Sequence, residues 1–200
     1  MQVDVRPAQE HHPLGRSPVG TVLMLPGRAY PCSASLLAWT TRALQAGGWA
    51  VHQAQWQLDR LPDDPRAFVE GVARRLDEVE RPAGPVLVVA KSLGTLAAHR
   101  AAERGYPAVW LTPVLVAAGR HPLPGASADL AERLSTYPAP NLMVGGTADP
   151  LWRSGFRAAG EVVESKGADH ALEVGDWRAS LRHHERVASS VADFAADVAR

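Results

Sequence analysis

The chain has 200 residues with 21 basic and 21 acidic side chains. This length suits one compact domain over residues 1–200. The balanced charge, without a basic cluster, argues against nucleic-acid binding. No apolar run approaches the roughly 20 residues of a membrane span, the N-terminus lacks a charged-then-apolar signal sequence, and the single cysteine is typical of a reducing compartment. We therefore expect a cytoplasmic protein of one domain that binds neither nucleic acid nor membrane, and we leave its oligomeric state open.

Residues 1–19 are polar and contain three prolines and two histidines. They form either an extra edge strand or a loose N-terminal arm. His11 and His12 are a conceivable metal contact, but a solvated tail is the simpler interpretation. We predict no metal site and no cofactor.

From about Gly20 onward, strand-like runs alternate with helical patterns. The runs are Val22–Leu25, Ala50–Ala54, Val86–Ala90, Ala108–Thr112, Leu142–Gly145 and Glu161–Glu164. Such alternation predicts a mostly parallel sheet of about six to seven strands, covered by helices on both faces as a three-layer α/β/α sandwich.

Three of the helical patterns have clear boundaries or apolar faces. One runs from Ser33 to Ala46 and is stopped by Gly47-Gly48, where a left-handed cap fits. A second starts at Asp64 before Pro65. Apolar residues at a spacing of three or four mark the buried face of the second helix and of the last one: Phe68, Val72, Leu76 and Val79, then Val187, Val191, Phe194 and Val198. We assign these faces to the core.

The pentapeptide Ala90-Lys91-Ser92-Leu93-Gly94 follows the apolar run 85–89 and opens an amphipathic segment that ends at Gly105. A serine in a tight strand-to-helix turn has a strained backbone and an exposed hydroxyl at the carboxyl end of the sheet. Small residues are needed two positions before and after it, and Ala90 and Gly94 are small. The pattern is typical of a nucleophile elbow; the alternative is a tight turn with a helix-capping serine.

Two further polar residues follow later strands. Asp149 comes directly after the strand-like segment 141–146, although before Pro150 it also suits a helix N-cap. His170 ends the glycine-containing loop 166–170, where the alternative is an ordinary solvated histidine. Asp169, beside it, is an alternative acid. His183 and His184 fall in the last helix, and we expect them at the surface.

The elbow, followed by an acid and then a histidine, resembles the α/β-hydrolase superfamily over nearly the whole chain from about Gly20. The resemblance implies that Ser92 is the nucleophile, His170 the general base and Asp149 the acid. It also implies an oxyanion hole formed by the backbone N–H groups of Leu93 and Arg28. The loop Pro26-Gly27-Arg28-Ala29 departs from the family at Pro26, which replaces the usual histidine.

The expected site is open. Segment 113–140 has room for a proline-rich loop and one short helix near Ala128–Leu134, but not for the helical cap of many superfamily members. We name four residues as candidates for the pocket lining, each with core packing as the alternative: Tyr30, Trp152, Val114 and Leu115. Arg28 and Lys91 are either anion-attracting groups or plain surface charges. Cys32 is either a reactive thiol or a half-buried small hydrophobe.

These features predict a serine hydrolase that cleaves a carboxyl ester or thioester of a small or exposed acyl substrate through an acyl-enzyme. The serine at the elbow excludes superfamily relatives that use a carboxylate nucleophile, such as haloalkane dehalogenases, or a cysteine, such as dienelactone hydrolases. The alternative is a non-catalytic binding or scaffolding protein with the same fold.

Overall fold

The computed structural model describes residues 3–9, 17–117 and 123–200. In these ranges seven strands form one sheet in the order β1-β3-β2-β4-β5-β6-β7. The strands are β1 (Val3–Pro7), β2 (Gly20–Leu25), β3 (Trp49–Trp56), β4 (Val86–Lys91), β5 (Ala108–Leu111), β6 (Asn141–Gly146) and β7 (Glu161–Ser165). Only β1 is antiparallel to its neighbour β3; all other pairs are parallel. The predicted mostly parallel sheet is confirmed.

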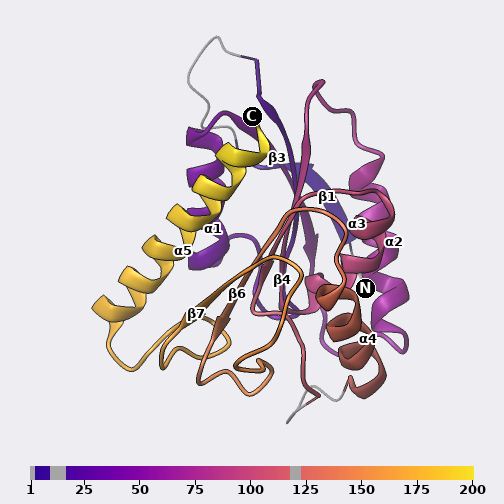
Figure 1. Ribbon diagram of the computed structural model, residues 1–200. Helices are drawn as coiled ribbons and strands as arrows, with labels where there is room; N and C mark the ends of the chain where they lie inside the picture. Colours follow the sequence, from indigo (N-terminus) through magenta and orange to yellow (C-terminus); the bar gives the residue numbers. More distant parts are fainter. Residues whose placement is uncertain (1–2, 10–16, 118–122) are drawn as a thin grey trace.

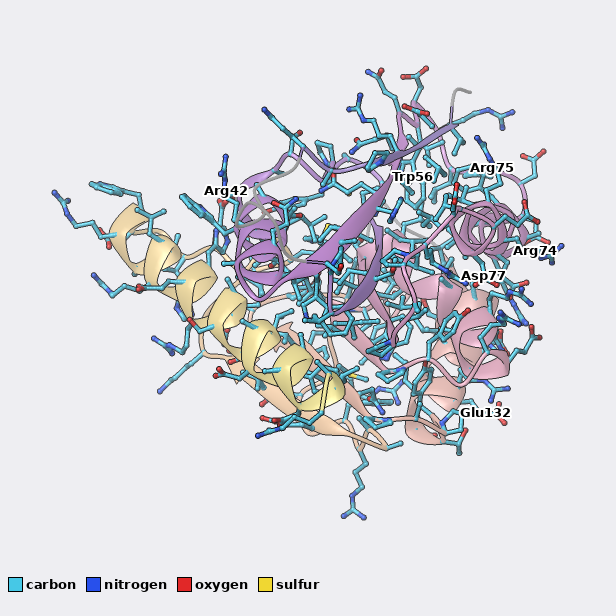
Figure 2. All side chains as sticks on the ribbon, turned by 90° about the horizontal axis from the view of Figure 1, so that it is seen from above. Arg42, Trp56, Arg74, Arg75, Asp77 and Glu132 are labelled. Atoms are coloured by element: carbon cyan, nitrogen blue, oxygen red, sulfur yellow. The ribbon has the colours of Figure 1, made fainter. Side chains whose placement is uncertain are left out.

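Helices cover both faces of this sheet (Figure 1). One face carries α1 (Ser35–Ala46) and α5 (Trp177–Val198), and the other carries α2 (Pro65–Asp77), α3 (Ala98–Glu103) and α4 (Pro124–Ser135). Seen from above in Figure 2, Arg42 on α1 and Asp77 on α2 lie on opposite sides of the sheet. The three-layer α/β/α arrangement is therefore confirmed.

The central strands are apolar on both faces because both faces are covered. Every residue of β2 and β6 is buried. Successive side chains alternate between two cores. Leu23 packs with the α2 side, whereas Met24 packs with the α1 and α5 side. This alternation places each polar residue at a strand end on a definite side of the sheet.

Three of the predicted helix boundaries are found in the structure, but α1 begins at Ser35 rather than Ser33, and α2 ends at Asp77, before Val79. The Asp64 carboxylate accepts a hydrogen bond from the Ala67 N–H at 2.9 Å and caps α2. Gly48 and Gly105 follow α1 and α3 with φ of +86° and +64°, in the left-handed region that glycine favours.

The N-terminal segment supplies the edge strand that was one of the two alternatives, because residues 3–7 form β1. His11 and His12 lie outside the described residues.

Helix α4 is longer than the predicted 128–134 helix, and the described part of segment 113–140 contains no cap domain. In the described ranges, no helix combines the length and apolarity that crossing a membrane requires.

The segment after the elbow differs from the continuous α-helix that we expect from its pattern. It begins as a 3-10 helix, η1 (Ser92–Ala97), and becomes α-helical only at α3. The Thr95 hydroxyl donates to the Ser92 carbonyl, and this bond competes with the α-helical partner of that carbonyl. The first turn is therefore tight where it leaves the sheet.

Candidate active site

Ser92 lies at the tip of a strained turn at the carboxyl end of β4. Its φ is +52°, a left-handed conformation that a non-glycine residue seldom adopts. Gly94 is needed beside it, because a Cβ there would lie 2.7 Å from the Pro26 carbonyl oxygen and 2.8 Å from the Leu25 carbonyl oxygen. The sequence pattern of small, X, Ser, X, small therefore corresponds to a close approach of η1 to the end of β2.

Ser92, His170 and Asp149 form one continuous hydrogen-bonded chain. The Ser92 Oγ lies 2.7 Å from His170 Nε2. The other ring nitrogen, Nδ1, lies 2.7 Å from Asp149 Oδ2. A carboxylate accepts only, so Nδ1 carries a proton and Nε2 is free to accept the serine proton. This is the arrangement in which an imidazole acts as a base toward a hydroxyl.

Of the two carboxylates near His170, Asp149 is the one in contact with the ring. Its side chain is fully buried, and Oδ1 accepts a hydrogen bond from the Leu151 N–H at 2.8 Å. In the described segment between Asp149 and β7 no helix begins, so the N-cap alternative does not apply. Asp169 instead accepts from the N–H groups of Ala171 and Glu173 at 2.8 and 3.0 Å and shapes the loop that holds His170.

The loops after β6 and β7 are joined to each other, which explains why the acid and the histidine meet. The Ala148 N–H donates to the Ala168 carbonyl at 3.0 Å. The Gly167 N–H donates to the Thr147 hydroxyl at 2.7 Å. Gly146 lets the loops approach, because a Cβ on it would lie 2.2 Å from the Ala168 oxygen.

No family model matches this sequence, and no curated protein matches it. Solved structures do. Est1E from Butyrivibrio proteoclasticus, in a structure with ferulic acid bound, is 13% identical with a TM-score of 0.69, over 98% of this chain and 95% of that chain. The esterase domain of a Rhodothermus marinus protein is 16% identical, with a TM-score of 0.61 over 96% and 99%. XC6422 from Xanthomonas campestris, an α/β serine hydrolase without a lid, is 13% identical, with a TM-score of 0.55 over 98% and 88%.

The chain has the α/β-hydrolase fold. In hydrolases with this fold, the oxyanion donors come from the residue after the elbow serine and from the loop after an earlier strand. Leu93 follows Ser92 at the start of η1, where the first N–H groups have no partner within the helix. The other loop lies against the serine, because a Cβ on Gly27 would be 3.8 Å from Ser92 Oγ. The Trp56 indole N–H holds this loop by donating to the Gly27 carbonyl at 2.9 Å.

A pocket of about 260 Å³ opens at Ser92. Its wall is mostly apolar, with Leu61, Leu93, Val114, Leu123 and Leu151 beside Arg28, Tyr30 and His170. Tyr30 and Val114 are thus lining residues, as we expect from the sequence.

The other two candidates for the lining, Leu115 and Trp152, are packed in the core instead. Leu115 is buried under the α2 side of the sheet. The Trp152 ring packs on Gly145, where a Cβ would lie 2.2 Å from it, and its indole N–H donates to Glu164 at 2.7 Å. Both residues follow strand ends, but their side chains turn away from the pocket.

Four charged or titratable residues for which the sequence suggested a surface position are buried or half-buried in the structure. Lys91 is 1% exposed, and His184 is 2% exposed. The His184 Nε2 lies 3.1 Å from the carbonyl oxygen of Ala171, next to His170, so α5 supports the histidine loop. His183 is half-buried. Arg28 is also half-buried, and its guanidinium donates to the Asp59 carbonyl at 2.9 Å.

Cys32 is buried more deeply than the half-buried hydrophobe that we expect. Its thiol contacts the Ala54 carbonyl at 3.4 Å, and burial raises the pKa of this thiol to about 12. Because the thiolate is the reactive form, we predict that iodoacetamide at pH 8 leaves Cys32 unmodified in the folded protein and modifies it in denaturant, as followed by intact mass. Rapid modification of the folded protein would contradict this assignment.

Proposed function

We propose that the protein is a serine hydrolase that cleaves carboxyl esters or thioesters of small or exposed acyl groups. The observation that carries the proposal is the unbroken chain of 2.7 Å contacts from Ser92 through His170 to the buried Asp149. A scaffold has no physical need for a strained serine at the mouth of a pocket. The esterase domain from Rhodothermus marinus and a monoacylglycerol lipase from Paleococcus ferrophilus, which is 13% identical with a TM-score of 0.61 over 97% of this chain and 100% of that chain, support ester cleavage as the chemistry.

In the proposed acylation, Ser92 Oγ attacks the substrate carbonyl carbon while its proton moves to His170 Nε2. Asp149 keeps its charge, holds the ring in the required tautomer and stabilises the imidazolium. The carbonyl oxygen becomes an oxyanion between the N–H groups of Leu93 and Arg28, each worth about 3 kcal/mol to the barrier. When the C–O or C–S bond breaks, His170 returns the proton to the leaving alcohol or thiol.

In the proposed deacylation, His170 takes a proton from water, and the resulting hydroxide attacks the acyl-enzyme. The C–Oγ bond then breaks, and the proton returns to Ser92. The same groups serve both half-reactions, and no cofactor is required. The apolar wall of the pocket suits a hydrocarbon acyl or alcohol group, and its volume of about 260 Å³ favours a short one.

Active-site labelling tests this proposal. We expect a fluorophosphonate probe to label the purified protein stoichiometrically, and Ser92→Ala to abolish both the labelling and the hydrolysis of p-nitrophenyl acetate. Ser33→Ala, which removes an exposed serine outside the pocket lining, is the matched control and should behave as wild type. A series of p-nitrophenyl esters from acetate to decanoate should show falling kcat/KM with chain length.

If the folded wild type is neither labelled nor active on any ester, the hydrolase proposal fails and the binding-protein alternative takes its place. Labelling that persists in Ser92→Ala would likewise contradict the role of Ser92.

A further inference from the structure

Lys91 is a buried charge beside the candidate nucleophile that the proposed reaction does not use. It is the last residue of β4, and with 1% exposure it is among the largest fully buried side chains. Only two of the 21 basic residues are lysines, Lys91 and the exposed Lys166. Along β4 it continues the series Leu87 and Val89, whose side chains belong to the α1 and α5 core.

The Lys91 ammonium group has two hydrogen-bond acceptors and one aromatic ring as partners. It donates to the carbonyl oxygen of His170 at 2.8 Å and to the Thr112 hydroxyl at 3.0 Å. The face of the Tyr30 ring lies 4.4 Å from Nζ, a cation–π distance. Three different segments, the loops before α1, after β5 and after β7, therefore converge on one charged atom.

The contact with the His170 carbonyl bears directly on the candidate base. Asp149 holds the ring at Nδ1, and Lys91 holds the backbone of the same residue. Since Lys91 is covalently next to Ser92, it links the backbone of the base to the strand end that carries the nucleophile. With the ring and the backbone of His170 both held, few motions of the loop can change the distance between His170 Nε2 and Ser92 Oγ.

We propose that the Lys91 ammonium is a positioning residue, which holds the histidine loop so that His170 stays in contact with Ser92. This inference rests on the proposed function. The charge is expensive to bury, and an apolar residue of the same volume often stabilises a fold in such a place. The retention of a lysine here is therefore better explained by the geometry of the site than by stability.

The protonation of Lys91 gives the proposal a pH signature. Burial lowers the pKa of this lysine to about 8, and the charges of Asp149 and Asp169 oppose the decrease. The titratable groups around it are Tyr30 from the loop before α1, and Asp149, Asp169 and His170 from the loops after β6 and β7. Below pH 8 the ammonium is intact; above pH 8 it loses a donor and its charge, so activity should decline.

The first test is Lys91→Met, which keeps the length and removes the charge and the donors. We expect kcat to fall by about 10- to 100-fold, the range for a displaced catalytic group, with little change in KM and with the cooperative thermal unfolding retained. The decline above pH 8 should disappear in this variant. Lys166→Met, which removes the exposed lysine near the same loop, is the matched control and should match wild type.

The second test uses the protein labelled with 13C-lysine, in which only two Cε signals titrate. Lys166→Met assigns them. We expect the Lys91 signal to titrate near pH 8, at the midpoint of the alkaline decline in activity. Lys91→Gln, which restores a donor without a charge, should recover part of the rate but not the pH dependence, and it replaces Lys91→Met if that variant does not fold.

The positioning role would be overturned if folded Lys91→Met had the kcat of wild type and the same decline in activity above pH 8. It would also be overturned if the Lys91 signal titrated at a pH far from the midpoint of that decline. These outcomes differ from failure of the proposed function, in which the wild type itself is neither labelled by the fluorophosphonate nor active on esters.

Discussion

Replacing Asp149 with asparagine should lower kcat for p-nitrophenyl acetate by about 10⁴-fold while the protein remains folded. The asparagine oxygen can still accept the Leu151 N–H that Asp149 Oδ1 accepts at 2.8 Å. The asparagine NH2, however, would point a donor at His170 Nδ1. The ring would then carry its proton on Nε2, which faces Ser92 and must be free to accept a proton.

Asp169→Asn is the matched control, because it neutralises the other carboxylate next to His170. The asparagine in this variant would retain the oxygen that accepts the Ala171 and Glu173 N–H groups. We expect its kcat at pH 7 to stay within about threefold of wild type, because the His170 ring contacts Asp149 and the local hydrogen bonds of residue 169 are kept. The alkaline decline in activity should begin at a lower pH in this variant, because Asp169 raises the pKa of Lys91. Steady-state kinetics and fluorophosphonate labelling rates measure both variants. A larger loss in Asp169→Asn than in Asp149→Asn would reverse the assignment of the acid.

The sheet was predictable because the alternation of strands and helices is a local property of the sequence. The six expected strand runs all lie within strands of the structure or extend one residue beyond them, as Thr112 does beyond β5. The carboxyl ends of parallel strands share one edge, so residues that follow β4, β6 and β7 were expected to lie together. Ser92, Asp149 and His170 do so in the structure, and their catalytic roles remain a prediction.

Side-chain direction was less predictable, because it depends on packing between distant segments. Trp152 follows β6 at the site edge, but the space above Gly145 takes its ring into the core. His184 faces the histidine loop because of where α5 packs, which its helical spacing alone does not specify.

Lys91 is different, because its burial had a signal in the sequence. It ends a strand in the middle of a parallel sheet with helices on both faces, where each side chain is covered on one side or the other. Alternation along β4 from Leu87 and Val89 assigns it to the α1 and α5 face. A surface charge was expected because lysine is rarely buried unless paired, and its partners come from three segments distant in sequence.

Gly94→Ala should disable the site and destabilise the fold together. A Cβ at this position would lie 2.7 Å from the Pro26 oxygen and 2.8 Å from the Leu25 oxygen, both backbone atoms that cannot rotate away. Overpacking of this kind costs about 1–3 kcal/mol of the free energy of unfolding. To remove this overlap, the end of β2 must move away from η1. That movement would carry the loop with Gly27 and Arg28 away from Ser92.

Because this displacement separates the two proposed oxyanion donors, Leu93 and Arg28, we expect kcat/KM to fall by about 100-fold in the folded variant. Gly71→Ala is the matched control, since it makes the same change in helix α2, where the new Cβ would have no atom within 4 Å apart from its chain neighbours and the backbone of its own helix. It should leave activity unchanged and raise the free energy of unfolding by about 0.5–1 kcal/mol through helix propensity. Urea denaturation and ester kinetics measure both variants. Wild-type activity in Gly94→Ala would mean that the contact between β2 and η1 does not set the oxyanion geometry, and it would leave the Ser92, His170 and Asp149 chain to account for the rate.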